Sequence, residues 1–131
     1  MISLYVHPTC SSCRKASALL EELGVGVERR DYFRDRFTSA ELRSVLHRAG
    51  RTPTGMLSTR ARAYRELNIA ERDLQDEDLI DLMVAEPTLL RRPLAVSEAG
   101  STIGFNAVAL ASLARATTTA GPETTASVRD E

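Results

Sequence analysis

The sequence predicts a single α/β domain in which a βαβ unit is followed by an all-helical segment and then by a ββα unit. Three observations support this prediction. A strand-like run at residues 2–6 leads into a helical apolar face, capped helical patterns fill residues 38–86, and two short apolar runs flank residues 98–101. The 131 residues, 43% hydrophobic and 27% charged, suffice for one domain with one core.

The N-terminal βαβ unit is the first of these parts. Residues 2–6 (Ile-Ser-Leu-Tyr-Val) predict a buried strand, and residues 12–23 predict a helix that Gly24 closes. Residues 25–31 predict a second strand. We expect it to run parallel to the first, because a helix connects the two.

The segment at about 38–86 is expected to be helical throughout. Thr38 and Glu41 have the spacing of a capping box, and the helix that they open should end at Gly50. Residues 51–55 are expected to form a loop. Two more helices are expected, one from Ser58 or Thr59 to about Leu67 and one from Asp76 to just before Pro87.

The C-terminal part predicts a β-hairpin and a last helix. Residues 94–97 and 102–105 are the hairpin strands around a turn at 98–101, and Asn106 caps the helix that follows. From Thr117 the sequence has no apolar periodicity, so residues 117–131 are expected to be a disordered tail. The whole order is the thioredoxin-like layout, with a mixed four-stranded sheet and a helical insertion, in a domain spanning residues 1–116.

Composition and charge exclude several classes of protein. No apolar run approaches the ~18 residues of a membrane span. The N-terminus also lacks a secretory signal, so we expect a cytoplasmic protein with no membrane partner. The net charge is −1, but residues 1–65 carry +6 and residues 66–131 carry −7. Two explanations fit the many arginines equally well. One is codon bias, and the other is a positively charged face near Cys10 that attracts small anions or an acidic partner. Without overall basicity, no direct nucleic-acid binding is expected.

The two cysteines form a Cys-x-x-Cys motif where the first strand leads into the first helix. A helix N-terminus carries partial positive charge and free N–H groups, which favour a thiolate at Cys10. Cys10 would be the nucleophile, and Cys13 would resolve a mixed disulfide or a sulfenic acid. A structural zinc site would need two further ligands, and the only histidines are His7 and His47, so no metal is expected. Two ordinary cysteines remain the plain alternative.

Three residues beside the cysteines suggest an anion site. Arg14 follows Cys10 by one helical turn and would lie on the same face. The N–H groups of Ser11, Ser12 and Cys13 could form an anion-binding nest. A solvated Arg14 on an exposed helix face is the alternative.

Arg92-Pro93 precedes the first hairpin strand. Proline at a strand start suggests a cis peptide bond, with Pro93 facing the thiol pair, although simple punctuation between a helix and a strand would also place a proline there.

Several segments together resemble the arsenate reductase (ArsC)/Spx family. The similarity covers residues 1 to about 115 in the family's order. It is carried by residues 4–16, Ser58-Thr59-Arg60, Tyr64-Arg65-Glu66-Leu67, Leu89-Leu90-Arg91-Arg92-Pro93-Leu94 and Gly104-Phe105-Asn106.

The resemblance implies a thioredoxin-like fold and one of two functions. Spx-type proteins use a Cys-x-x-Cys redox switch and act on transcription through the C-terminal domain of the RNA polymerase α subunit. Arsenate reductases use one cysteine, matched by Cys10, together with glutathione as co-substrate and glutaredoxin; thioredoxin is a further candidate reductant. No bound cofactor is implied.

Cys13 favours the Spx-type branch, because the arsenate reductases do not need it. The resemblance implies that Arg60 and Arg92 hold an anion or act in the switch. The third arginine of the arsenate reductases falls at Phe105, and one missing charged hydrogen bond would cost about 1.5–3 kcal/mol. The polymerase-contacting glycine of the Spx type falls at Thr52.

Overall fold

The computed structural model describes residues 1–119 and divides into two compact units. The first unit consists of Met1–Arg30 and the chain from Arg92 onward, and the second consists of Asp31–Arg91. Each unit is described by itself.

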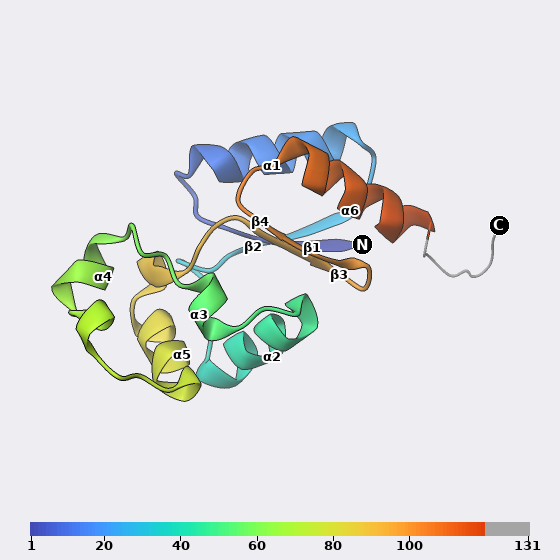
Figure 1. Cartoon of the computed structure of the whole chain (residues 1–131). Coiled ribbons are helices and arrows are strands. Elements are labelled where there is room, and N and C mark those ends of the chain that lie inside the picture. Colours follow the sequence, from blue (N-terminus) through green and yellow to red (C-terminus); the bar gives the residue numbers. More distant parts are fainter. Residues whose placement is uncertain (120–131) are drawn as a thin grey trace. The chain divides into compact units, whose positions relative to one another are not determined.

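The first unit holds a four-stranded mixed sheet with the strand order β2-β1-β3-β4 (Figure 1). Strand β1 pairs antiparallel with β3, and β3 pairs antiparallel with β4. The elements are β1 (Ile2–Val6), α1 (Ser11–Glu22), β2 (Val27–Asp31), β3 (Leu94–Ser97), β4 (Gly100–Ile103) and α6 (Ala107–Thr119). This arrangement confirms the predicted fold class.

Helices α1 and α6 pack side by side and share one core with the sheet (Figure 1). Side chains from β1, α1, β3 and α6 meet in this core, and the largest of them are almost fully buried: Ile2, Leu4, Leu20 and Leu110. Burial of each such side chain stabilises the unit by about 1.5–3 kcal/mol. Helix α1 is therefore held rigidly by its apolar face, and its N-terminus is fixed at the end of β1.

The hairpin turn is shorter than predicted. Ser97 pairs with Gly100, so only Glu98 and Ala99 lie between the strands, and β4 ends at Ile103 rather than at Phe105. Gly100 has φ +144°, a backbone conformation that glycine adopts without steric cost. The turn therefore closes at Gly100, two residues before the predicted second strand begins.

Helix α6 includes the first three residues of the predicted tail, 117–119. Asn106 caps it as predicted, with Oδ1 accepting the Ala109 N–H at 3.0 Å. At its other end Thr117 is buried, and its hydroxyl lies 2.7 Å from both Ser97 Oγ and the Leu113 carbonyl oxygen. These bonds hold residues 117–119 in the helix although they lack apolar periodicity. The rest of the predicted tail lies outside the described residues.

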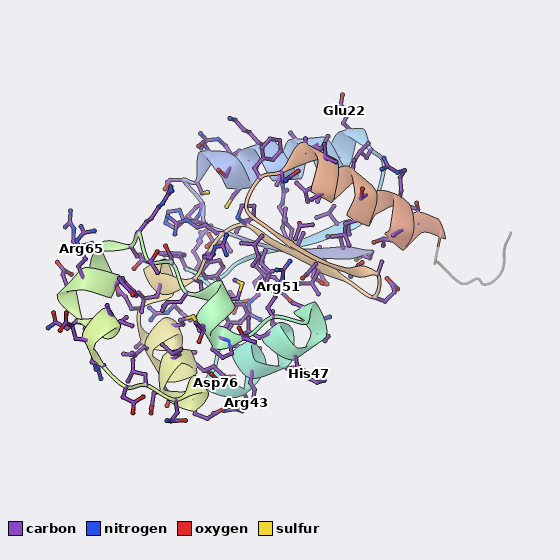
Figure 2. All side chains as sticks on the ribbon, in the orientation of Figure 1. Glu22, Arg43, His47, Arg51, Arg65 and Asp76 are labelled. Atoms are coloured by element: carbon purple, nitrogen blue, oxygen red, sulfur yellow. The ribbon has the colours of Figure 1, made fainter. Side chains whose placement is uncertain are left out.

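The second unit consists of helices and their connections, which confirms the predicted helical insertion. Its one exception is an isolated β-bridge between Leu57 and Leu90. The elements are α2 (Ser39–Ala49), α3 (Pro53–Met56), α4 (Arg62–Glu66), η1 (Ile69–Glu71), α5 (Asp76–Ala85) and η2 (Pro87–Leu89). The Thr38 capping box is present, with its hydroxyl accepting the Glu41 N–H at 3.1 Å. Arg43 of α2, labelled in Figure 2, forms an ion pair with Glu77 of α5.

Two predictions for the second unit are wrong. The segment predicted as a loop at 51–55 holds the first three residues of α3, because Thr52 caps this helix and Pro53 occupies its first position. The helix predicted to begin at Ser58 or Thr59 begins at Arg62 instead. The Ser58 N–H donates to the Leu89 carbonyl oxygen at 2.7 Å, and this bond keeps the chain extended there.

None of the helices within residues 1–119 is both long and apolar enough to cross a membrane.

Candidate redox site

Cys10 lies at the junction of the β1–α1 loop and α1. It is the N-cap residue of the helix, with φ −80° and ψ 121°, and its Sγ accepts the Cys13 backbone N–H at 3.3 Å. An N-cap side chain satisfies one of the free N–H groups at a helix start. The helix is thus capped by a thiol sulfur where a serine or aspartate oxygen is usual. The partial positive charge of the helix N-terminus favours negative charge on this sulfur.

Cys13 lies one turn into α1 and is nearly enclosed, with 3% of its surface exposed. Its Sγ accepts the His7 backbone N–H at 3.5 Å. Both thiols are free, and Cys10 is the more exposed of the two.

The two thiols have pKa values shifted in opposite directions. Burial alone would raise the pKa of Cys10. Hydrogen bonds from the thiol and backbone N–H of Cys13, then the hydrogen bond and charge of Arg92, outweigh it and lower the pKa of Cys10 below its ordinary 9.0. Burial, followed by the hydrogen bond that Cys13 gives to Cys10, raises the pKa of Cys13 to about 12. Cys10 is therefore the more acidic thiol of the pair and Cys13 the less acidic one.

Arg92 is the arginine that acts on both thiols. It precedes β3 and is joined to Pro93 by a cis peptide bond, as predicted. Pro93 is buried, and its carbonyl oxygen accepts the Gly104 N–H at 2.8 Å, which ties the start of β3 to the end of the hairpin. The Arg92 Nε is buried and makes no hydrogen bond within residues 1–119.

The other predicted site residues are placed differently. The Arg14 side chain is exposed, and it is not among the groups that shift the pKa of Cys10, although its backbone N–H donates to the Cys10 carbonyl oxygen at 3.1 Å. Ser11 is exposed and Ser12 is half-buried. Arg60 is exposed and belongs to the second unit. The structure thus brings together Cys10, Cys13 and Arg92.

Two further residues were not singled out from the sequence. The ring Nδ1 of His7 lies 3.1 Å from the backbone N of Thr9 and 3.0 Å from its hydroxyl oxygen. The Lys15 ammonium lies 6.0 Å from the ring centroid of Phe105, within the range of a cation–π contact. A cation thus lies over the ring of Phe105, where the arsenate reductase pattern has an arginine.

No group of three or more His, Cys, Asp or Glu side chains that could hold a metal ion occurs in the described part of the chain.

The fold and the site define an α/β protein of thioredoxin-like architecture with a pair of thiols at a helix N-terminus. The model of the ArsC family matches residues 5–112, and the chain belongs to the ArsC family.

The chain is 35% identical over 106 residues to the global transcriptional regulator Spx of Enterococcus faecalis, an alignment that covers 81% of this chain and 80% of that protein. It is 34% identical over 106 residues to the global transcriptional regulator Spx 1 of Bacillus cereus, with 81% of each covered. Among solved structures it resembles the arsenate reductase from Vibrio cholerae, with a TM-score of 0.77, 26% identity and coverage of 85% of this chain and 95% of that one.

Proposed function

We propose that this protein is a thiol–disulfide switch that regulates transcription through RNA polymerase in the cytoplasm. The observation that supports it is that the pKa values of the two thiols shift in opposite directions. The pKa of the partly exposed Cys10 is lowered, while that of the buried Cys13 is raised to about 12. In such a pair, the thiol with the lower pKa reacts with the oxidant as a thiolate, and the second thiol then forms the disulfide with it.

The oxidation balances with a peroxide as the two-electron oxidant. The Cys10 thiolate attacks one oxygen of hydrogen peroxide, the O–O bond breaks, Cys10 becomes a sulfenic acid, and the departing hydroxide takes a proton from solvent to leave as water. The Cys13 sulfur then attacks Cys10 Sγ, an S–S bond forms, and the sulfenic oxygen leaves as a second water. Reduction by glutaredoxin or thioredoxin, through a mixed disulfide at the more exposed Cys10, returns both thiols.

The polymerase partner is supported by the relatives named above as transcriptional regulators and by the resemblance to the Spx type. We propose that the protein binds the C-terminal domain of the RNA polymerase α subunit rather than DNA. Thr52 replaces the family's glycine in the contacting loop, but its φ is −93°, a conformation open to every residue. Its hydroxyl accepts the Gly55 N–H at 3.0 Å, so threonine caps α3 at this position.

The experiment measures binding of the purified α C-terminal domain to the reduced and the peroxide-treated protein. Wild type should form a reversible Cys10–Cys13 disulfide and change its affinity for the domain on oxidation. Cys10→Ser and Cys13→Ser should bind equally well in both conditions, and Ser12→Ala, which leaves both thiols, should behave as wild type. Binding by none of these proteins would refute the polymerase partner. A wild type that forms no internal disulfide would refute the switch.

The second candidate function is reduction of arsenate. The Cys10–Arg92 pair supports it, because a guanidinium beside a thiolate can hold an oxyanion for attack. In that reaction an S–As bond forms at Cys10 as an oxygen leaves arsenic as water. Thiols of glutathione and glutaredoxin then supply two electrons and become a mixed disulfide while As(V) is reduced to As(III). Water finally breaks the S–As bond, which releases arsenite and returns the Cys10 thiol.

An assay of arsenate reduction with glutathione and glutaredoxin separates the two functions. Turnover that is lost in Cys10→Ser but kept in Cys13→Ser would favour the reductase. No turnover, together with a reversible disulfide, would favour the switch.

A further inference from the structure

The loop that carries Cys10 is a β-turn whose first residue is His7. The Cys10 N–H donates to the His7 carbonyl oxygen at 3.4 Å, three residues back, and Pro8 occupies the second turn position, which proline favours. The N–H of His7 donates to Cys13 Sγ at 3.5 Å. The backbone of His7 therefore contacts both cysteines of the pair.

The His7 side chain braces the same turn from outside. Its Nδ1 accepts the Thr9 backbone N–H at 3.1 Å, and the Thr9 hydroxyl lies 3.0 Å from the same nitrogen. A backbone N–H can only donate, so Nδ1 is the acceptor in this geometry, and the Thr9 hydroxyl donates to it as well. Thr9 is thereby held directly before the N-cap thiol.

We propose that His7 is a positioning residue of the thiol pair, whose ring acceptor Nδ1 fixes the His7–Cys10 turn so that Cys10 Sγ stays at the N-cap of α1. The proposal rests on the redox role proposed above. It assigns to His7 no contact with a substrate. Without the ring acceptor, the Thr9 N–H bonds to water instead, and the hydrogen bond from the Cys13 N–H to Cys10 Sγ is populated less often.

The test uses the alkylation rate of Cys10 by iodoacetamide, measured across pH by mass spectrometry of the Cys10 peptide. His7→Leu removes the acceptor at similar volume. His7→Asn restores an acceptor, because an asparagine side-chain oxygen bonds the N–H two residues on. Thr9→Val removes only the hydroxyl donor. Thermal melts confirm that each variant is folded.

His7→Leu should slow alkylation at neutral pH by about threefold to tenfold and move its pH midpoint upward, as the loss of a hydrogen bond predicts. His7→Asn should return within about twofold of wild type, and Thr9→Val should lose about twofold. If His7→Leu does not fold, the other two variants carry the test.

A His7→Leu rate equal to wild type would overturn the proposal, as would a folded His7→Asn that is as slow as His7→Leu. The alkylation needs no polymerase and no oxidant. Failure of polymerase binding would therefore refute the proposed function alone and leave the role of His7 standing.

Discussion

The backbone N–H of Cys13 donates to the Sγ of Cys10 across 3.3 Å. The first helical turn thus supplies both the second thiol and an N–H donor that lowers the pKa of the first. Any change that frays this turn should raise the pKa of Cys10 and separate the pair at the same time. The reactivity of Cys10 therefore reports on the local order of the start of α1.

Arg92, rather than Arg14, should control the reactivity of Cys10. The guanidinium of Arg92 lowers the pKa of Cys10 by a hydrogen bond and by its charge, while the Arg14 side chain is exposed. Arg92→Gln should raise the pH midpoint of Cys10 alkylation and slow the reaction at neutral pH by about threefold to tenfold, the loss of one charged hydrogen bond near a partly exposed group. Arg92→Lys should keep part of the effect.

Arg14→Gln is the matched control, since it removes the same charge from the same neighbourhood. It should leave the alkylation midpoint where it is in wild type. A larger shift for Arg14→Gln than for Arg92→Gln would restore the assignment that the sequence suggested.

The strand, loop and helix that surround Cys10 can be predicted from the sequence because each depends on interactions between residues close together in the chain. A strand, a proline-containing loop and a capped apolar helix are each readable from a few neighbouring residues, and they place Cys10 at a helix start. The cis bond before Pro93 was predicted from its place at a strand start and is present. The role of Arg92 against that of Arg14 was not predictable in this way, because Arg92 is 82 positions from Cys10 along the chain and only the folded sheet brings them together.

The missed elements have physical signals of different strength. Helix α3 could have been found from Thr52-Pro53, a cap followed by proline at the first helical position. The late start of α4 depends on the Ser58–Leu89 backbone bond, which no local pattern encodes. In the Cys10 loop, a ring nitrogen of His7 accepts the N–H two residues on, as an asparagine oxygen often does. A single histidine in the sequence does not predict this hydrogen bond.

The free energy of unfolding should depend on Cys13 at alkaline pH. The pKa of Cys13 is about 12 in the folded protein, above its ordinary value of 9.0. As the pH rises from 9.0, the unfolded chain loses this proton first, so the stabilising contribution of the protonated thiol is complete below 9.0 and falls away toward 12.

Urea unfolding of Cys10→Ser and of Cys10→Ser/Cys13→Ser, at a series of pH values, isolates this contribution because other groups titrate alike in both proteins. The single variant should lose stability faster than the double variant as the pH rises above 9.0. Parallel curves would show that burial, the largest cause and the one that remains in Cys10→Ser, does not raise the pKa of Cys13.

The buried hydroxyl pair at the end of α6 should stabilise the first unit. Thr117 and Ser97 lie 2.7 Å apart through their hydroxyl oxygens, and both residues are buried. Thr117→Val keeps the shape but leaves Ser97 with one partner fewer, so we expect a loss of about 1–2 kcal/mol in unfolding free energy. Thr118→Val is the control, because Thr118 is exposed and, within residues 1–119, its hydroxyl bonds only carbonyl oxygens of its own helix, those of Ala114 and Arg115. Equal losses in the two variants would mean that the Ser97–Thr117 contact is not what matters.

The two faces of α6 should respond very differently to the same truncation. Leu110 is fully buried in the core between α1, α6 and the sheet, whereas Val108 is 77% exposed. Leu110→Ala removes buried apolar surface and leaves a cavity, so the free energy of unfolding should fall by about 2–5 kcal/mol. Val108→Ala should change it by less than about 0.5 kcal/mol, as surface substitutions usually do. Urea unfolding followed by circular dichroism measures both. A cost for Val108→Ala as large as that for Leu110→Ala would mean that α6 packs through its other face.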